Sequence, residues 1–175
     1  MSTRAHRAGS PPSTSAGCSS LRLVPRAYDH PDARELQQAL YRSQRALYGF
    51  ADDPTDSNPE DFLPPRGAFV IGYDADTAPI ACGGWTWHEP HTAEIKRMYV
   101  DASHRGHRHG NQVLSGLEVR AWVASANRII LETGVHNIAA LELYRANGYH
   151  PIPSYMSGRN PSINRALTKS LRDAR

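Results

Sequence analysis

The feature that most constrains the fold is a strand, a basic loop and a helix that follow one another in mid-chain. The segment TAEIKRMYV (92–100) has the composition of a strand, and the segment 110–124 has the apolar periodicity of a helix. The helix's apolar stripe consists of Val113, Leu114, Leu117 and Ala121. The loop HRGHRHG (104–110) joins the two segments. Such a loop points the free N–H groups and the positive dipole end of the helix at one place, which suits a phosphate or pyrophosphate.

The loop alone is compatible with four interpretations: a solvated basic loop, a metal site, a nucleic-acid contact and a phosphate site. A metal is not expected, because the loop offers no Asp, Glu or Cys to complete a ligand set. The histidines considered as ligands are His88, His91, His104, His107 and His109. Nucleic acid is not expected either, because the helix carries mainly small and apolar side chains instead of base-reading ones.

Composition places the chain among globular single-domain proteins. Its 175 residues suffice for one domain with a substantial core, and its formal net charge of +3 does not require a nucleic-acid partner. No apolar run reaches the length of a membrane span. Its two cysteines, Cys18 and Cys82, have no zinc-ligand spacing, which favours a reducing, cytoplasmic setting. Residues 1–20 are predicted to be a disordered tail, and residues 21–175 a single domain.

The order of predicted elements indicates a mixed α/β domain. A first strand and helix precede three successive strands, and helix, strand and helix then lead to two final strands. An acidic, turn-rich stretch at 51–66 is predicted to be a mobile loop with room for a helical turn. The predicted strands are 21–25, a hairpin over 68–88, 92–100, 128–133 and, at the edge of the sheet, 162–171, and the predicted helices are 29–49, 110–124 and 137–147.

The last predicted helix carries polar residues on one face. Asn137, Ala140 and Tyr144 lie at positions i, i+3 and i+7, so that small Ala140 leaves room along the helix between two polar side chains. Spacing alone equally allows Tyr144 to be an ordinary core residue whose hydroxyl has found a partner.

These segments together resemble the GCN5-related N-acetyltransferase (GNAT) superfamily, in its small bacterial branch, over about residues 21–170. The family's motif Q/R-x-x-G-x-G/A corresponds to RGHRHG, with Arg105 and Gly110 in place and Arg108 where the middle glycine is expected. AEIKRMYV, the block LETG…N…A…LY…GY and PIP-x-Y extend the resemblance. It implies a mostly antiparallel sheet that is splayed between two parallel strands, 92–100 and 128–133, with helices on both faces.

The resemblance also implies a site for acetyl-CoA in the opening between those two strands. The strand backbone at Met98, Tyr99 and Val100 would hold the pantetheine, Asn137 would contact the same arm, and Tyr144 would protonate the departing thiolate. Backbone N–H groups of the loop would bind the pyrophosphate. At Arg108, where the sequence departs from the family motif, we expect the side chain to lean outward toward the adenosine 3′-phosphate. The implied loop residues are Arg105, Gly106, His107, Arg108, His109 and Gly110.

Acetylation of an amine also needs a proton acceptor, because only the neutral amine attacks a thioester. Glu94 is the first candidate, with His91 and Glu89 as alternatives. Glu94 equally fits a role in orienting substrate or in pairing with Lys96 or Arg97. Those two residues break the strand's alternation, which is compatible with a β-bulge that would aim a backbone donor at the thioester oxygen.

The expected function is acetyl-CoA-dependent N-acetyltransfer to a primary amine by direct transfer in a ternary complex, with no metal. The alternative is a non-catalytic acyl-CoA-binding regulatory module of the same fold. The acceptor is expected to be a small molecule in preference to a protein, and it would enter between 51–62 and 153–160. The acidic side chains of 51–62 either attract a cationic amine or are simply solvated. The acceptor's identity, the acyl chain and the oligomeric state, a homodimer included, stay open.

Overall fold

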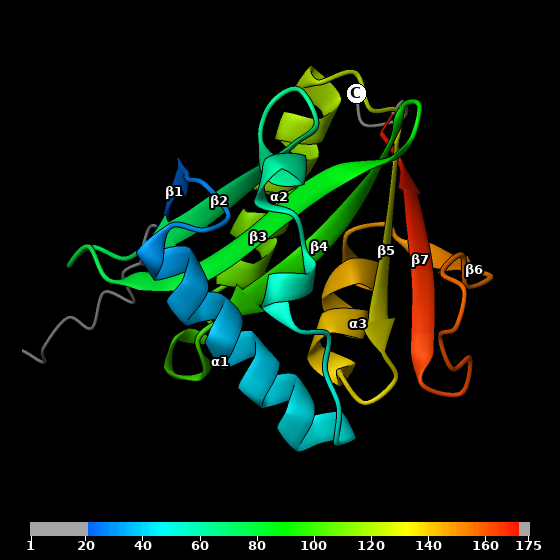
Figure 1. Ribbon diagram of the computed structural model, residues 1–175, viewed down its shortest axis with the longest axis horizontal. Coiled ribbons are helices and arrows are strands. Elements are labelled where there is room, and N and C mark those ends of the chain that lie inside the picture. The colour runs from blue at the N-terminus through cyan, green and yellow to red at the C-terminus, as the bar shows by residue number, and fades with distance from the viewer. Residues whose placement is uncertain (1–20, 172–175) are drawn as a thin grey trace, which may run out of the picture.

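The computed structural model of the protein describes residues 21–171, so the predicted tail at 1–20 lies outside the described residues. Within that range the chain forms one seven-stranded mixed sheet in the order β1-β2-β3-β4-β5-β7-β6 (Figure 1). The strands are β1 (Arg22–Pro25), β2 (Gly67–Tyr73), β3 (Pro79–Glu89), β4 (Thr92–Val100), β5 (Arg128–Gly134), β6 (His150–Ile152) and β7 (Asn164–Ser170). The helices are α1 (Pro31–Tyr48), α2 (His109–Val123) and α3 (Ile138–Ala146), with short 3₁₀ turns η1 (Pro54–Asp56), η2 (Pro59–Phe62) and η3 (Ala102–His104).

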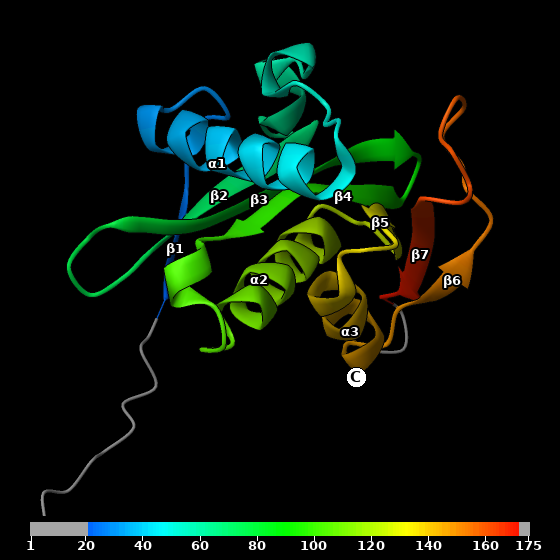
Figure 2. The same cartoon turned by 90° about the horizontal axis from the view of Figure 1, so that it is seen from below.

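Helices cover both faces of the sheet, with α1 on one face and α2 and α3 on the other (Figure 2). The larger core lies between the sheet and α2, whose predicted stripe of Val113, Leu114, Leu117 and Ala121 is completely buried. A second core beneath α1 is built around aromatic side chains, with Tyr28 stacked on Phe62 and Phe69 edge-on to both. The predicted element order and fold class are therefore confirmed.

The sheet opens between β4 and β5, which are its parallel pair. They pair only over Thr92–Glu94 and 128–130, after which the two strands separate. Beyond that point β5 stays attached to β7, with which it pairs from Arg128 to Gly134. The implied splayed sheet is confirmed, and its opening faces the N-terminal end of α2 and the helix α3.

One detail of the predicted topology is wrong. The segment 162–171 is expected at the edge, but β7 lies between β5 and β6, and the three-residue β6 forms the edge. Pro151 at the centre of β6 weakens its strand signal, because proline has no N–H to donate. The same missing donor makes proline tolerable at an edge, where one side of the strand needs no partner.

Candidate active site

A β-bulge interrupts β4 where the strand leaves β5. The pairing between β3 and β4 shifts between Cys82 and Gly84, and Arg97 opposite them takes a φ of 57°. This irregularity is a β-bulge. The broken alternation of the strand's sequence is compatible with such a bulge. Cys82 is fully buried here and donates its thiol to the carbonyl oxygen of Arg97 over 3.5 Å. Burial raises the pKa of this thiol to about 12, so Cys82 is a packed core residue.

The Arg97 side chain fastens the acidic stretch 51–66 to this bulge. Its guanidinium donates to the carbonyl oxygens of Asp52 and Asp53 and to the hydroxyl of Ser57, each over 3.1 Å. The stretch, predicted to be a loop, holds the 3₁₀ turns η1 and η2, and Phe62 at its end is buried. A strand residue thus positions the segment that borders the expected acceptor entrance.

Tyr144 reaches the bulge from the α3 side. Its hydroxyl donates to the sulfur of Met98 over 3.7 Å, and its side chain belongs to the core beneath α2. Burial raises the pKa of Tyr144 to about 12, which keeps the hydroxyl protonated at neutral pH. The structure therefore brings together two of the predicted residues, one on β4 and one on α3, beside the opening of the sheet.

The next two residues of β4 divide between the two cores. Tyr99 packs against the core beneath α1, and Val100 packs against the core beneath α2. Arg105 folds back over this strand end, with its Nε donating to the Val100 carbonyl oxygen over 3.1 Å and its guanidinium 5.9 Å from the Tyr99 ring centre. The loop and the end of β4 are therefore one connected unit.

The loop that precedes α2 has the backbone of a glycine-rich turn, although one of its key positions is arginine. Gly106 and Arg108 take φ values of 85° and 62°, in the left-handed region. Arg108 is the N-cap of α2 and its side chain makes no capping hydrogen bond. A non-glycine residue pays backbone strain in this conformation. Arg108 thus adopts the conformation for which the motif's glycine is suited.

The side chains of the loop do not all face solvent. Residues 105–108, which include His107, are exposed, so the loop that leads into α2 is accessible. His109 is only 2% exposed, and its Nδ1 lies 3.2 Å from the Gln112 side-chain oxygen. A Cβ added at Gly110 would lie 3.3 Å from Leu143, so this glycine also permits α2 and α3 to pack closely. The accessible loop fits an anionic group; the side chain of His109 faces the core.

Asn137 is the N-cap of α3, and its side-chain oxygen accepts a hydrogen bond from the Ala140 N–H over 3.4 Å. This cap starts α3 immediately after β5. It places Asn137 on the same helix as Tyr144, whose hydroxyl lies beside the β4 bulge. The Asn137 cap therefore helps to fix where α3 begins, and α3 carries Tyr144 beside the opening.

Glu94 lies on the α1 side of the opening, because its neighbours Ala93 and Ile95 face the core beneath α2. Its side chain is 8% exposed. One oxygen lies 2.8 Å from Nζ of Lys96, and the other accepts a hydrogen bond of 3.0 Å from the Tyr155 hydroxyl. Burial and the charge of Glu94 raise the pKa of Tyr155, so its hydroxyl keeps its proton.

The two alternatives to Glu94 lie at the closed end of the β4–β5 pair. Glu89 forms an ion pair with Arg128 over 2.5 Å, and Nδ1 of His91 lies 2.9 Å from the Ser125 carbonyl oxygen. Both partners belong to the region where β5 begins. Only Glu94 among the three candidates lies at the residues after which the strands separate.

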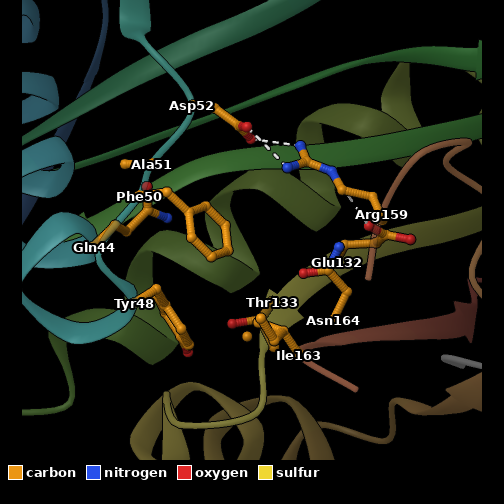
Figure 3. Close-up of a pocket in the computed structure, with 11 residues that line it drawn as sticks. Gln44, Tyr48, Phe50, Ala51, Asp52, Glu132, Thr133, Arg159, Ile163 and Asn164 are labelled. Atoms are coloured by element: carbon orange, nitrogen blue, oxygen red, sulfur yellow. Dashed lines mark hydrogen bonds and ion pairs between the residues drawn. The ribbon is translucent and has the colours of Figure 1, made fainter. Parts of the chain in front are cut away.

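A pocket opens on the α1 side beside this point (Figure 3). Two of its lining residues, Arg159 and Asp52, form a two-point ion pair, with nitrogen–oxygen distances of 2.8 and 2.5 Å. This pair joins the two segments between which the acceptor is expected to enter. The pocket is lined by residues from α1 and the turn after it, the acidic stretch, β5, the segment before β7 and the first residue of β7: Gln44, Tyr48, Phe50, Ala51, Asp52, Glu132, Thr133, Gly134, Arg159, Ile163 and Asn164.

Sequence reasoning did not single out Glu132, Tyr155 or Arg159 as site residues. The first two stand inside the quoted blocks LETG and PIP-x-Y, so a signal for them existed in the family resemblance. Arg159 comes from a turn-rich segment with no periodicity and reaches Asp52 across 107 positions of sequence. Within residues 21–171, no three His, Cys, Asp or Glu side chains gather as a metal site would require.

Comparison with known proteins agrees with the architecture. The model of the acetyltransferase (GNAT) family matches residues 31–149. An IAA acetyltransferase from Azospirillum brasilense is 38% identical over 126 residues, which cover 67% of this chain and 82% of that protein. A sheet split between two parallel strands, with an exposed loop leading into a helix beside the split, is the architecture of this class of acetyltransferase. The chain belongs to the acetyltransferase (GNAT) family.

Solved structures show the same fold at low sequence identity. An acetyltransferase of the GNAT family from Staphylococcus aureus Mu50 matches with a TM-score of 0.71 at 18% identity, covering 87% of this chain and 100% of that one. A Bacillus subtilis acetyltransferase in complex with CoA matches with a TM-score of 0.63 at 17% identity, covering 87% and 99%. In the described part of the chain, no helix has the length and apolarity needed to cross a membrane.

Proposed function

We propose that the protein transfers an acetyl group from acetyl-CoA to a primary amine of a small molecule, directly, in a ternary complex. The observation that carries the proposal is the placement of Glu94 and Tyr144 on opposite faces of the opening between β4 and β5. A group able to accept a proton and a group able to donate one thus flank the place where a thioester would lie. A Bacillus subtilis acetyltransferase of the same fold was solved in complex with CoA, which supports CoA as the carrier of the transferred group.

The residues beside the opening fit acetyl-CoA. The exposed loop 105–108 and the first N–H groups of α2 suit its pyrophosphate. Met98, Tyr99 and Val100 would hold the pantetheine along the free edge of β4, and Asn137 would contact it from the start of α3. Arg108 takes the left-handed backbone conformation of this turn, and its side chain is exposed. The side chain would meet the 3′-phosphate.

The chemistry assigned to the chain has two proton steps. Acetyl-CoA supplies an activated acetyl group; the amine nitrogen bonds to its carbonyl carbon as the carbon–sulfur bond breaks. Glu94 accepts the proton lost by the amine, directly or through water, while Lys96 and Tyr155 hold the carboxylate in place. The Tyr144 hydroxyl, protonated because of its burial, supplies a proton to the leaving thiolate.

A thiol-release assay with acetyl-CoA and a panel of primary amines tests the proposal. Release of free thiol with a matching acetylated amine in the mass spectrum is expected, and initial-rate lines should intersect, as direct transfer requires. Parallel lines would contradict a ternary complex. Acetyl-CoA binding without turnover on any amine would instead identify a non-catalytic acyl-CoA-binding module. Competition among acetyl-, propionyl- and succinyl-CoA would establish the acyl chain.

A further inference from the structure

One oxygen of Glu132 on β5 is buried without a hydrogen-bond donor. Its Oε1 accepts a hydrogen bond of 2.8 Å from the Ser154 hydroxyl, whereas Oε2 accepts none. The Glu132 side chain is only 9% exposed and lines the pocket of Figure 3. A buried carboxylate oxygen without a hydrogen-bond donor is costly, so a cation that donated a hydrogen bond to this oxygen would be stabilised there.

Arg159, the nearest cation, does not meet this need. Its Nε lies 4.0 Å from Oε2 of Glu132, which is too long for a hydrogen bond. Both of its terminal nitrogens donate to the carboxylate of Asp52. The guanidinium therefore lies at ion-pair distance from the carboxylate without donating a hydrogen bond to Oε2.

The position of Glu132 relates this oxygen to the reaction. Ile130 is the last β5 residue that pairs with β4, and its partner is Glu94. Because side chains alternate along a strand, Glu132 projects to the same face as Ile130 and Glu94. A cation bound at Glu132 would therefore lie on the α1 side of the opening, near the residue proposed to accept the amine's proton.

The wall opposite Glu132 is aromatic. Tyr48 and Phe50 face β5 across the pocket (Figure 3), with ring centres 6.1 Å apart and planes inclined by 43°. Phe50 is 50% exposed, although it is a large apolar side chain beside a pocket. Gly134 makes room for this wall, because a Cβ there would lie 2.1 Å from the Tyr48 hydroxyl. An exposed ring beside a carboxylate suits a cation attached to a flat apolar body.

We propose that Glu132 binds the ammonium group of an arylalkyl amine whose ring packs on Phe50 and Tyr48. The inference rests on the proposed function, since it assigns the acceptor class for that same reaction. Glu132 is an amine-binding residue: it positions the nitrogen at the opening, and the proton still passes to Glu94. The acceptor's charge and its ring are then recognised by different walls of one pocket.

Three probes separate these two contributions in the intact chain. 2-Phenylethylamine has both charge and ring, 2-phenylethanol has the ring without the charge, and n-butylamine has the charge without the ring. Calorimetric titration of the wild-type protein, free of acetyl-CoA, should show 2-phenylethylamine binding at least about tenfold more tightly than either of the others. Equal binding of the amine and the alcohol would overturn the proposal, with no variant needed.

Variants locate the contact. Glu132→Gln should raise KM for 2-phenylethylamine by about 30-fold. KM for acetyl-CoA should stay unchanged, because the residues proposed to hold acetyl-CoA are not altered. Glu35→Gln, which removes the same charge from an exposed position on α1 outside the pocket, should behave as wild type. Phe50→Ala should weaken the binding of 2-phenylethylamine and leave the binding of n-butylamine unchanged. Unaltered amine binding in Glu132→Gln would overturn the assignment.

Two outcomes separate a failure of the transfer reaction from a failure of the acceptor class. If no amine releases thiol from acetyl-CoA, the transfer reaction is wrong, yet the calorimetric comparison of the three probes still decides whether the pocket selects an arylalkyl ammonium. If other amines are acetylated and 2-phenylethylamine neither binds nor reacts, the reaction stands and the acceptor class is wrong.

Discussion

The hydroxyl of Tyr155 donates a hydrogen bond of 3.0 Å to Glu94, which joins the segment after β6 to the central strand across 61 positions of sequence. The Tyr155 ring also packs edge-on to His88 at 5.0 Å. Together with Lys96, which takes the other oxygen of Glu94, this contact fixes the carboxylate at the opening of the sheet. The segment carrying Tyr155 thus orders the proposed proton acceptor.

Tyr155→Phe is expected to lower kcat/KM for the amine about tenfold, which corresponds to about 1.4 kcal/mol of transition-state stabilisation. The ring keeps its packing on His88, and only the donor to Glu94 is lost. Steady-state kinetics with varied amine would measure the loss, and KM for acetyl-CoA should stay constant. Tyr41→Phe on α1, which removes only a 3.4 Å contact with Arg45, is the matched control. Equal rates for all three proteins would exclude a role of Tyr155 in positioning Glu94.

Tyr144→Phe is expected to lower kcat about 100-fold, because it removes the proposed proton donor. The pKa of Tyr144 is raised to about 12 by burial, so the hydroxyl stays protonated at every pH of an ordinary assay. Its titration should therefore add no basic limb to the wild-type pH–rate profile. The hydroxyl contacts only a sulfur at 3.7 Å, so thermal unfolding should shift little.

Tyr149→Phe provides the matched control for Tyr144→Phe. The two rings are neighbours, 5.6 Å apart, but the Tyr149 hydroxyl donates to Glu118 over 3.0 Å, away from the opening. This variant should lose about 1 kcal/mol of stability and keep its kcat. A similar kcat for Tyr144→Phe and Tyr149→Phe would remove Tyr144 from the mechanism.

Local periodicity was sufficient to predict most of the fold. The helix α2 has four apolar residues at helical spacing, and all four are completely buried. β6 was the exception for topology, since three residues around Pro151 have too little pattern to compete with the longer β7. His109 shows a finer limit: it stands in a basic loop by composition, but α2 begins at this residue and turns its side chain into the core.

The candidate site could be predicted only where it lies on regular elements. Glu94 and Tyr144 stand on a strand and a helix whose faces follow from residue spacing. Arg159 and Tyr155 reach the site through an irregular segment, and their contacts depend on how that segment returns over the sheet. No local sequence rule specifies such a path, because loop contacts are determined by the assembled surface that the loop covers.

Arg108→Gly is expected to stabilise the fold by about 1 kcal/mol, because glycine relieves the left-handed backbone at φ 62°. Arg108→Ala keeps the strained backbone and should show no such gain. Both variants should weaken acetyl-CoA binding by about threefold to tenfold if the side chain meets the 3′-phosphate. Dephospho-CoA, which lacks that phosphate, should bind wild type and Arg108→Ala equally. Unchanged acetyl-CoA affinity in Arg108→Gly would show that only the loop backbone serves the cosubstrate.

Asp52→Asn is expected to lower the free energy of unfolding at pH 7 by less than about 1 kcal/mol, since the Asp52 side chain is 52% exposed and the pair with Arg159 is partly screened. The hydrogen bond and charge of Arg159 lower the pKa of Asp52 from 3.8 in the folded state. A carboxylate with a depressed folded pKa stabilises the fold above its unfolded pKa, and this contribution disappears as the pH falls through the folded value. Urea unfolding should therefore separate wild type from Asp52→Asn at pH 7, and the difference should shrink steadily below about pH 3.8. Asp29→Asn, which alters an exposed 4.0 Å pair with Arg34, should show no comparable trend. A difference between wild type and Asp52→Asn that does not change with pH would mean that the ion pair between Asp52 and Arg159 contributes nothing to stability.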